Sequence, residues 1–357
     1  MYINPRLHIF DRSEQCTQFG VGEQSVILDG LTGPDKKLIN LLIEGTDEPG
    51  RLLAGKCGLL PARADYLIRM LQPVLIMPLQ SETALSGLRA DRLEPDIIQW
   101  SAAYELNAAP IMERRNRSAV RVMGLGRTGS TIAQALAAAG IGTLLLDDNH
   151  RVRPADVGAG SFRLCDVGMP RAAAVRRQIH HIDPTIQTHA IRQPGQERTY
   201  DASFFTLDLV IHIAHDITDE HLQAELMHKE QPHLSVILRD RDVLIGPLVV
   251  PGQTACLGCV DQHRADQDPR WLEICRTMRA RMSAEMNPPP EETAVALFAA
   301  GSAVLQSLLL IDGVNRPSGW SSVVQMRAAD GSSTTCSYQP HPTCGCTQPA
   351  PAASAAG

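Results

Sequence analysis

The sequence predicts an α/β protein: an N-terminal winged-helix-like domain followed by a Rossmann-like α/β domain with a zinc-stapled C-terminal hairpin. Three observations predict this fold class. Three short strand patterns and then three helix patterns open the chain, a glycine-rich loop joins a strand to a helix in its middle, and two close cysteine pairs lie about 85 residues apart in its second half. With 357 residues the chain exceeds one ordinary core, so we expect two domains.

Residues 1–78 are expected to form the small domain. Its strands are marked by short apolar runs between turn residues, and its helices by proline at their starts and glycine near their ends. The predicted elements are strands at 7–10, 17–20 and 25–28 and helices at 34–45, at about 49–55 and from Pro61 onward. Strands followed by helices in this order are typical of a winged-helix-like domain.

This small domain offers a candidate peptide-binding surface. An extended peptide can pair with an exposed strand edge while its side chains fill a groove beside it, and arginines can pair with acidic peptide residues. The strand at 25–28 and the helix from Pro61 supply the candidates, which are Ser25, Val26, Ile27, Leu28, Arg63, Tyr66, Leu67, Arg69 and Met70. The alternative is that Leu67, Met70 and Leu71 are core residues at helical spacing and that both arginines lie on a solvated face.

Charge argues against nucleic-acid binding. Residues 1–78 contain eight Lys/Arg and nine Asp/Glu, a net of 8 − 9 = −1, and no basic stripe. A DNA-binding winged helix would need such a stripe. The whole chain has a net charge of −6, which also disfavours an anionic membrane surface. A DNA-binding regulator is therefore the least favoured function class.

Three further segments complete the predicted organisation. Residues 79–118 are expected to be a helical linker, and 348–357 a disordered tail of small residues. Residues 293–311 carry no charge over nineteen positions, close to the length that spans a bilayer. Their alanine content and the polar Ser302 and Gln306 favour a helix buried against a sheet, so we expect no membrane partner.

The middle of the chain carries a nucleotide-binding pattern. A strand at 119–123 leads into Gly124-Leu-Gly126-Arg-Thr-Gly129, an alanine-rich helix, and a second strand that ends at Asp147 and Asp148. Such glycines let phosphates approach the helix N-terminus, and the acid holds ribose hydroxyls. We therefore predict that Gly124, Gly126, Gly129, Asp147 and Asp148 bind a cofactor. The alternative is that Gly126 and Gly129 serve only close helix–strand packing.

The two cysteine pairs predict a structural zinc site within residues 119–347. Cys256 and Cys259, with Cys344 and Cys346, supply the four sulfurs of a closed tetrahedral site. A single pair would also suit redox chemistry, but the second pair favours a metal. An Asp330-Gly331 turn predicts a hairpin that positions the last two cysteines. Nine cysteines and an N-terminus without a secretory pattern lead us to expect a cytoplasmic protein.

Over residues 118–346 these motifs resemble the ThiF/MoeB adenylyltransferases of the ubiquitin-activating-enzyme superfamily. The stretch 165–172 resembles that family's Asp-hydrophobic-Gly-x-x-Lys-Ala element. The strand at 207–213, followed by Asp216 and Asp219, resembles the strand that ends in a magnesium-binding aspartate, and both aspartates are candidates. The resemblance implies ATP and Mg²⁺ as ligands and a homodimer built through this domain.

The chain departs from that family where adenylation needs cations. The family's Asn-Leu-x-Arg-Gln is Asp156-Val-Gly-Ala-Gly160 here, and its lysine is Arg171. Arginine keeps the charge but not the compact ammonium geometry. Arg127, inside the glycine loop, is a possible substitute for the missing charge against the triphosphate. The catalytic candidates are thus Arg127, Arg171, Asp216 and Asp219. We expect a degenerate adenylation site, and the alternative is an active enzyme that adenylates a peptide carboxylate or amide.

A narrower resemblance covers almost the whole chain. The segment 246–252, the first cysteine pair, His263-Arg264, residues 268–271 and the ending 341–346 are similar to ThiF-like proteins of azole-modified ribosomal peptide biosynthesis. This resemblance implies an accessory subunit whose N-terminal domain binds the leader of a precursor peptide. It also implies a partner, a separate YcaO-type cyclodehydratase that forms the thiazole or oxazole precursors.

Overall fold

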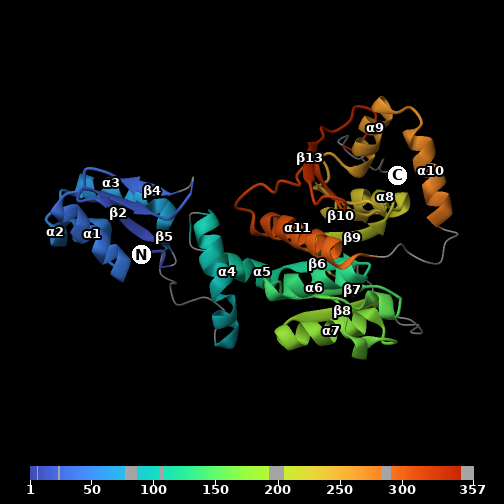
Figure 1. Ribbon diagram of the computed structural model, residues 1–357, viewed down its shortest axis with the longest axis horizontal. Coiled ribbons are helices and arrows are strands. Elements are labelled where there is room, and N and C mark those ends of the chain that lie inside the picture. Colours follow the sequence, from blue (N-terminus) through green and yellow to red (C-terminus); the bar gives the residue numbers. More distant parts are fainter. Residues whose placement is uncertain are drawn as a thin grey trace, which may run out of the picture. The chain divides into compact units, whose positions relative to one another are not determined.

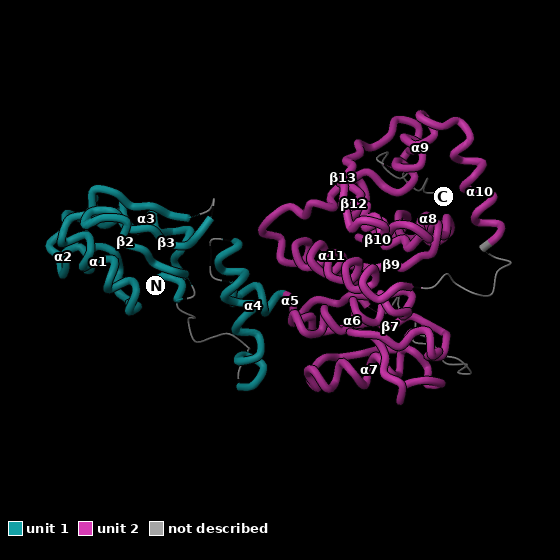
Figure 2. Tube along the Cα trace, in the orientation of Figure 1, with its two compact units in different colours: residues 1–114 teal, residues 115–357 magenta. Residues whose placement is uncertain are grey.

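The computed structural model describes residues 1–5, 7–22, 25–76, 87–104, 106, 108–192, 205–282 and 291–346. The chain divides into two compact units, Met1–Arg114 and Arg115–Gly357 (Figure 2). The division falls within helix α5 (Ala109–Arg117), near the end of the helical linker expected at 79–118. The tail predicted at 348–357 lies outside the described residues.

The first unit contains the expected strands and helices (Figure 1). Strands β2, β3 and β4 form an antiparallel sheet with β3 in the centre. A two-residue pairing of β1 with β5 was not predicted, because strands this short leave no periodic pattern. The elements are β1 Tyr2–Ile3, β2 Ile9–Ser13, β3 Cys16–Phe19, β4 Val26–Leu28, α1 Gly33–Glu44, α2 Gly50–Cys57, α3 Pro61–Leu71, η1 Gln72–Val74, β5 Leu75–Ile76 and α4 Leu88–Tyr104.

Local sequence explains the helices of the first unit. Thr32 and Asp35 form a capping box at the start of α1, where each side chain satisfies a backbone N–H that has no partner in the first turn. The apolar faces of α1 and α3 then pack on the sheet, and Leu38, Leu67 and Leu71 are at most 1% exposed. Burial of these side chains holds the unit together.

The second unit is built on one mixed sheet of eight strands in the order β13-β12-β11-β10-β9-β6-β7-β8. Strands β10, β9, β6, β7 and β8 are parallel, and β11, β12 and β13 continue the sheet in antiparallel fashion. The strands are β6 Ala119–Met123, β7 Thr143–Asp147, β8 Gln187–Arg192, β9 Leu209–His215, β10 His233–Leu238, β11 Asp242–Val249, β12 Ser322–Arg327 and β13 Ser333–Ser337. The α/β fold and the predicted terminal hairpin are present.

Helices cover both faces of this sheet. On β9, the side chain of Ile213 lies on the α6 side, 3.3 Å from where a Cβ on Gly129 would be, whereas Val210 and Ala214 pack against α8 and α9. Because alternate residues of a strand point to opposite faces, α6 lies on one face and α8 and α9 on the other. The helices are α6 Arg127–Ala138, α7 Arg171–Ile182, α8 Glu220–His228, α9 Leu257–Gln267, α10 Trp271–Met282 and α11 Thr293–Asp312, with short 3₁₀ turns η2 Pro154–Asp156 and η3 Leu164–Asp166.

The apolar segment at 293–311 forms helix α11. Among the described residues it is the one helix long and apolar enough to cross a membrane, and half of its most apolar stretch is buried. It packs against α6, β10 and β11 (Figure 1). Packing against a sheet explains its low polarity, as expected from the sequence.

Candidate functional site

A cavity of about 220 Å³ opens at the carboxyl ends of β6, β7 and β9. The chain runs from β6 to β7 on one side and later returns to β9 on the other side of β6. Open α/β sheets bind ligands at such a switch point. The lining residues are Gly124, Gly126, Arg127, Asp147, Asp148, Asn149, His150, Arg153, Ala155, Asp156, Arg171, Ile213, His215 and Glu291. The cavity is below the usual range for small-molecule pockets, about 300–1,000 Å³.

The three loop glycines have different roles. Gly124 has φ +87°, a backbone conformation that favours glycine. A Cβ on Gly129 would lie 1.8 Å from the carbonyl oxygen of Gly124, so this glycine allows α6 to approach β6. A Cβ on Gly126 would lie 2.1 Å from Oε1 of Glu291. Gly126 therefore leaves room for a carboxylate of the chain itself.

Asp147, expected to hold a ribose, is already paired. It is 1% exposed, and its Oδ2 accepts hydrogen bonds from Arg121 Nε at 3.0 Å and from Arg121 Nη2. Arg121 lies on β6 and pairs in register with Leu145 of β7, beside Asp147. The parallel pairing of the two strands thus brings the cation to the acid.

Asp148 belongs to a second buried network. Its Oδ2 accepts a hydrogen bond from the Leu125 N–H at 2.7 Å and one from Arg171 Nη1 at 3.2 Å. Arg171 also donates to both oxygens of Asp156, at 2.8 Å from Nη2. Burial alone would raise the pKa of Asp148, but the hydrogen bond from His150 and the charge of Arg171 outweigh it and hold that pKa well below its usual range. Two carboxylates therefore neutralise the one arginine.

Arg127 donates its hydrogen bonds to the chain. Its Nη1 bonds the carbonyl oxygen of Glu291 at 2.8 Å and Thr293 Oγ1 at 3.1 Å, and its Nη2 bonds the carbonyl oxygen of Val157 at 2.8 Å. The guanidinium thereby links the glycine loop to the start of α11. It is a structural clamp as well as a candidate phosphate ligand.

The two aspartates that follow β9 are not among the residues that line the cavity. Of the described residues at this strand end, Ile213 and His215 line it, and Asp216 and Asp219 do not. Asp219 caps α8 by accepting a hydrogen bond from the His221 N–H at 2.9 Å. Asp216 has φ +61°, a strained conformation for a non-glycine residue.

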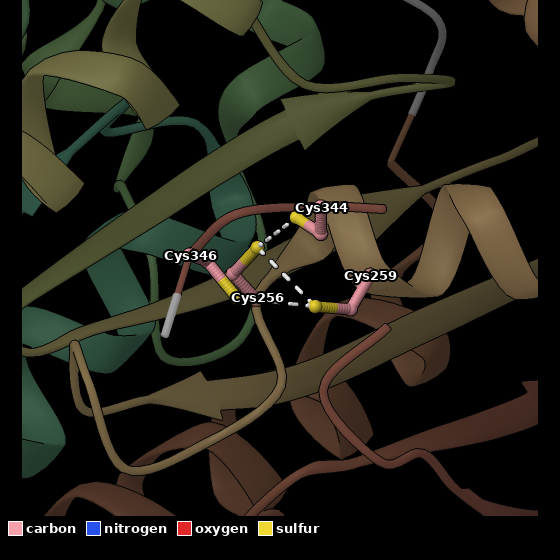
Figure 3. Close-up of side chains that lie close together, drawn as sticks. All are labelled: Cys256, Cys259, Cys344 and Cys346. Atoms are coloured by element: carbon pink, nitrogen blue, oxygen red, sulfur yellow. Dashed lines mark hydrogen bonds between the residues drawn. The ribbon is translucent and has the colours of Figure 1, made fainter. Parts of the chain in front are cut away.

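The four cysteines meet in a single cluster (Figure 3). The sulfur of Cys256 lies 3.8 Å from that of Cys259 and 3.4 Å from that of Cys344, and the sulfur of Cys259 lies 3.2 Å from that of Cys346. Tetrahedral coordination with metal–sulfur bonds of about 2.3 Å requires sulfur–sulfur distances of roughly 3.8 Å. The three distances are at or below that value and all four sulfurs lie within 4.8 Å of one another, so a small outward shift of the sulfurs would admit a divalent metal ion.

The surroundings of the cluster also favour a cation. Burial, with the neighbouring Cys259, raises the pKa of Cys346 to about 12, because a second thiolate is unfavourable beside the first. The His341 N–H donates to Cys259 Sγ at 3.2 Å, a contact typical of the outer shell of metal sites. A metal ion here would tie the segment after β13 to the start of α9.

The candidate peptide-binding residues of the first unit fall into two groups. Leu28 and Leu67 are 3% and 1% exposed and belong to the core. Ile27, Tyr66 and Met70 are 42%, 46% and 40% exposed. They lie on β4 and α3, which contact each other. We call Ile27, Tyr66, Arg69 and Met70 the β4–α3 surface; Ser25 and Val26 are partly buried beside it.

The two arginines of α3 also differ. Arg63 donates from Nε and Nη2 to the buried carboxylate of Asp35, at 3.1 and 3.0 Å, and its guanidinium lies 5.5 Å from the Tyr66 ring centre. Arg69 is exposed, and within the described parts of the chain its side chain has no hydrogen bond or ion pair. Arg69 is therefore the freer of the two.

Sequence reasoning did not identify Arg121, His215 and Glu291. Arg121 interrupts an otherwise apolar strand, which was a usable signal for a buried partner. No local sequence pattern marks Glu291 as a site residue, because it accepts a hydrogen bond from the N–H of Thr128, 163 residues away.

Comparison with known proteins identifies relatives of the second unit. A model of the ThiF family matches residues 101–347. Protein HesA of Nostoc sp. is 26% identical over 213 residues, which are 59% of this chain and 82% of HesA. The tRNA threonylcarbamoyladenosine dehydratase of Bacillus subtilis is 32% identical over 127 residues, 35% of this chain and half of the relative.

Solved structures share the fold over nearly the full length. MccB of E. coli, solved with ATP, has a TM-score of 0.72 at 15% identity, covering 97% of this chain and 98% of MccB. MccB has also been solved with N-formylated MccA. PaaA has a TM-score of 0.68 at 17% identity, covering 93% of this chain and 99% of PaaA. At these identities the likeness shows the fold.

Proposed function

The chain belongs to the ThiF family, and from this premise we propose that it is an accessory subunit of ribosomal peptide modification. It binds the leader of a precursor peptide and delivers it to a separate YcaO-type cyclodehydratase, which forms azoline rings. The observation that carries this proposal is the internal pairing of charge in the nucleotide cavity. Arg171 is neutralised by Asp148 and Asp156, so it is not free to hold a triphosphate.

The cavity supports a degenerate adenylation site in a second way. Adenylation develops negative charge on phosphate oxygens, which cations and metal ions must stabilise. At the end of β9 the lining residues are Ile213 and His215, and neither side chain offers the oxygen ligand that Mg²⁺ prefers. In this proposal the acidic residues that line the cavity form structural ion pairs, and the partner enzyme carries out the reaction on the peptide.

The first unit supports the peptide-binding half of the proposal. In this reading it is a winged-helix-like domain, and the leader pairs with the edge of β4 while its apolar side chains contact Ile27, Tyr66 and Met70. Arg69 is available to an acidic leader residue. Ser25 and Val26 complete the strand edge, and Leu28 and Leu67 support it from the core.

The remaining parts have structural roles in this proposal. The cysteine cluster holds zinc, which ties the chain end to α9. The protein is a homodimer, and the half-exposed Leu297, Phe298 and Leu305 on one side of α11 are candidates for its interface. Light scattering of the purified protein tests the dimer, and zinc analysis tests the metal.

The deciding experiment measures leader binding. A fluorescein-labelled leader of a candidate precursor peptide is titrated with protein, with and without the cyclodehydratase, and anisotropy is recorded. We expect saturable binding that Ile27→Glu weakens by more than tenfold, because a charge would be desolvated at the contact. Absence of binding under both conditions contradicts the proposal.

An active adenylating enzyme is the second candidate. The glycine loop and helix N-terminus support it, and a protein of this fold, MccB, has been solved with ATP. In this reading the chain activates a peptide carboxylate or amide. ATP–pyrophosphate exchange that depends on the cognate peptide would establish this second function and displace the first.

A further inference from the structure

We propose that Glu291 acts as the cavity's own anion: its carboxylate occupies the position that a phosphate group would take at the N-terminus of α6 and competes for it. We call this position, formed by Gly126, Arg127 and Thr128, the anion seat. The inference deepens the proposed function, since it names a residue that keeps nucleotide out of the cavity. It is a statement about ligand exclusion and can be tested apart from leader binding.

The contacts place the carboxylate in the seat. Glu291 Oε2 accepts a hydrogen bond from the Thr128 N–H at 2.6 Å. Its Oε1 lies over Gly126, where any Cβ would approach it to 2.1 Å. Thr128 is the second residue of α6, and the first N–H groups of a helix have no partner within the helix. These are the groups that hold phosphates in other proteins, so Glu291 satisfies the same donor.

The electrostatics keep the carboxylate ionised. Burial alone would raise the pKa of Glu291, but the nearby His215 imidazole and the hydrogen bond from the Thr128 N–H outweigh it and lower the pKa. His215 Nε2 lies 3.5 Å from Oε1. The positive end of the helix dipole adds to this preference for an anion. A phosphate group that entered the cavity would therefore meet a negative charge already in place.

The carbonyl group of Glu291 and the residues that follow it are anchored as well. Arg127 Nη1 bonds the carbonyl oxygen of Glu291 and the hydroxyl of Thr293, and Glu292 caps α11 by accepting the Val295 N–H at 3.0 Å. An intramolecular ligand held in this way acts at a high effective concentration. Its occupancy raises the apparent dissociation constant of any competitor by the inverse of the free fraction.

Two roles for Glu291 make different predictions. If it only ties α11 to the glycine loop, its removal lowers stability and leaves anion affinity unchanged. If it is a competitor, its removal raises affinity for a phosphate-bearing ligand, whatever happens to stability.

The experiment is calorimetric titration of the purified full chain with Mg-ATP and with inorganic pyrophosphate. The variants are Glu291→Ala, which empties the seat, Glu291→Gln, which removes only the charge, and Glu292→Gln, the matched control on the next residue. We expect Glu291→Ala to bind pyrophosphate at least tenfold more tightly than wild type. We expect Glu291→Gln to show a smaller gain and Glu292→Gln to show none.

The inference is overturned if folded Glu291→Ala and Glu291→Gln bind pyrophosphate no more tightly than the wild-type protein does. If Glu291→Ala does not fold, Glu291→Gln decides the question by the same criterion. Leader anisotropy is measured on the same preparations. Absent leader binding contradicts the proposed function. Leader binding that persists while the Glu291 variants gain no affinity for pyrophosphate contradicts only the Glu291 inference.

Discussion

The glycine-loop cavity and the cysteine cluster lie in the same unit, yet the chain provides for their charges in opposite ways. In the cavity, Asp147 pairs with Arg121 and Arg171 pairs with Asp148 and Asp156. In the cluster, four sulfurs contact one another, and ionising them together requires an added cation. A ligand-binding motif thus predicts where side chains lie. Whether an external ion is needed to balance their charge depends on the ion pairs that the chain itself provides.

The largest expected effect concerns the cluster. Replacement of Cys259 by serine, or removal of metal by a chelator, should lower the free energy of unfolding by on the order of 5 kcal/mol, because metal binding energy is folding energy. Thermal unfolding and zinc content check this. Cys336→Ser is the control, since Cys336 is exposed and outside the cluster. Equal melting temperatures for the Cys259 variant and wild type would remove the contrast.

The second prediction tests whether cavity charges are structural. Arg171→Ala leaves the buried Asp148 without its guanidinium and Asp156 with only Arg153, at 3.5 Å, which should cost about 3–5 kcal/mol in urea unfolding. Arg153→Ala, at a side chain that is 45% exposed, should cost less than about 1 kcal/mol. A mild effect of Arg171→Ala, accompanied by loss of ATP binding, would instead mark Arg171 as a ligand residue.

In the first unit, too, stability and binding measurements can separate structural residues from ligand-binding residues, because the β4–α3 surface is exposed. Met70→Ala should weaken leader binding by about 3–10-fold, roughly 1 kcal/mol, through lost apolar contact and leave stability unchanged. Leu67 lies on the same helix but is buried in the core, so Leu67→Ala should lower the free energy of unfolding by about 2–5 kcal/mol. Anisotropy and urea unfolding of both variants separate surface from core. Equal effects on both measurements would contradict this division of α3.

The smallest expected effect distinguishes the two arginines of α3. Arg69→Ala should weaken leader binding by about two- to fivefold at low salt and less at high salt, because exposed charge pairs are screened. Arg63→Ala should act on stability, by about 1–3 kcal/mol, because it leaves the buried Asp35 without its main partner. A salt-dependent loss of leader affinity in the Arg63 variant alone would reverse the assignment.

Much of the fold could be predicted from local pattern. The strand Ala119–Met123, the glycine loop, the following helix and the C-terminal hairpin were expected within a few residues of their observed bounds. The pairing of β1 with β5 was not, because each strand has two residues. The cysteine pairs were assigned to one site correctly, since short spacing within each pair limits what else they can form.

The sequence by itself pointed to residues that line the cavity or form the cluster: Gly124 and Gly126 of the loop, the acids at the end of β7 and the four cysteines. Only the tertiary structure decided how they are used. Arg121 reaches Asp147 because β6 and β7 pair in parallel, and Glu291 reaches Thr128 across 163 residues because α11 packs against α6. Spacing along the chain reports local geometry, whereas the neutralisation of buried charge depends on distant segments that only the folded sheet and its helices bring together.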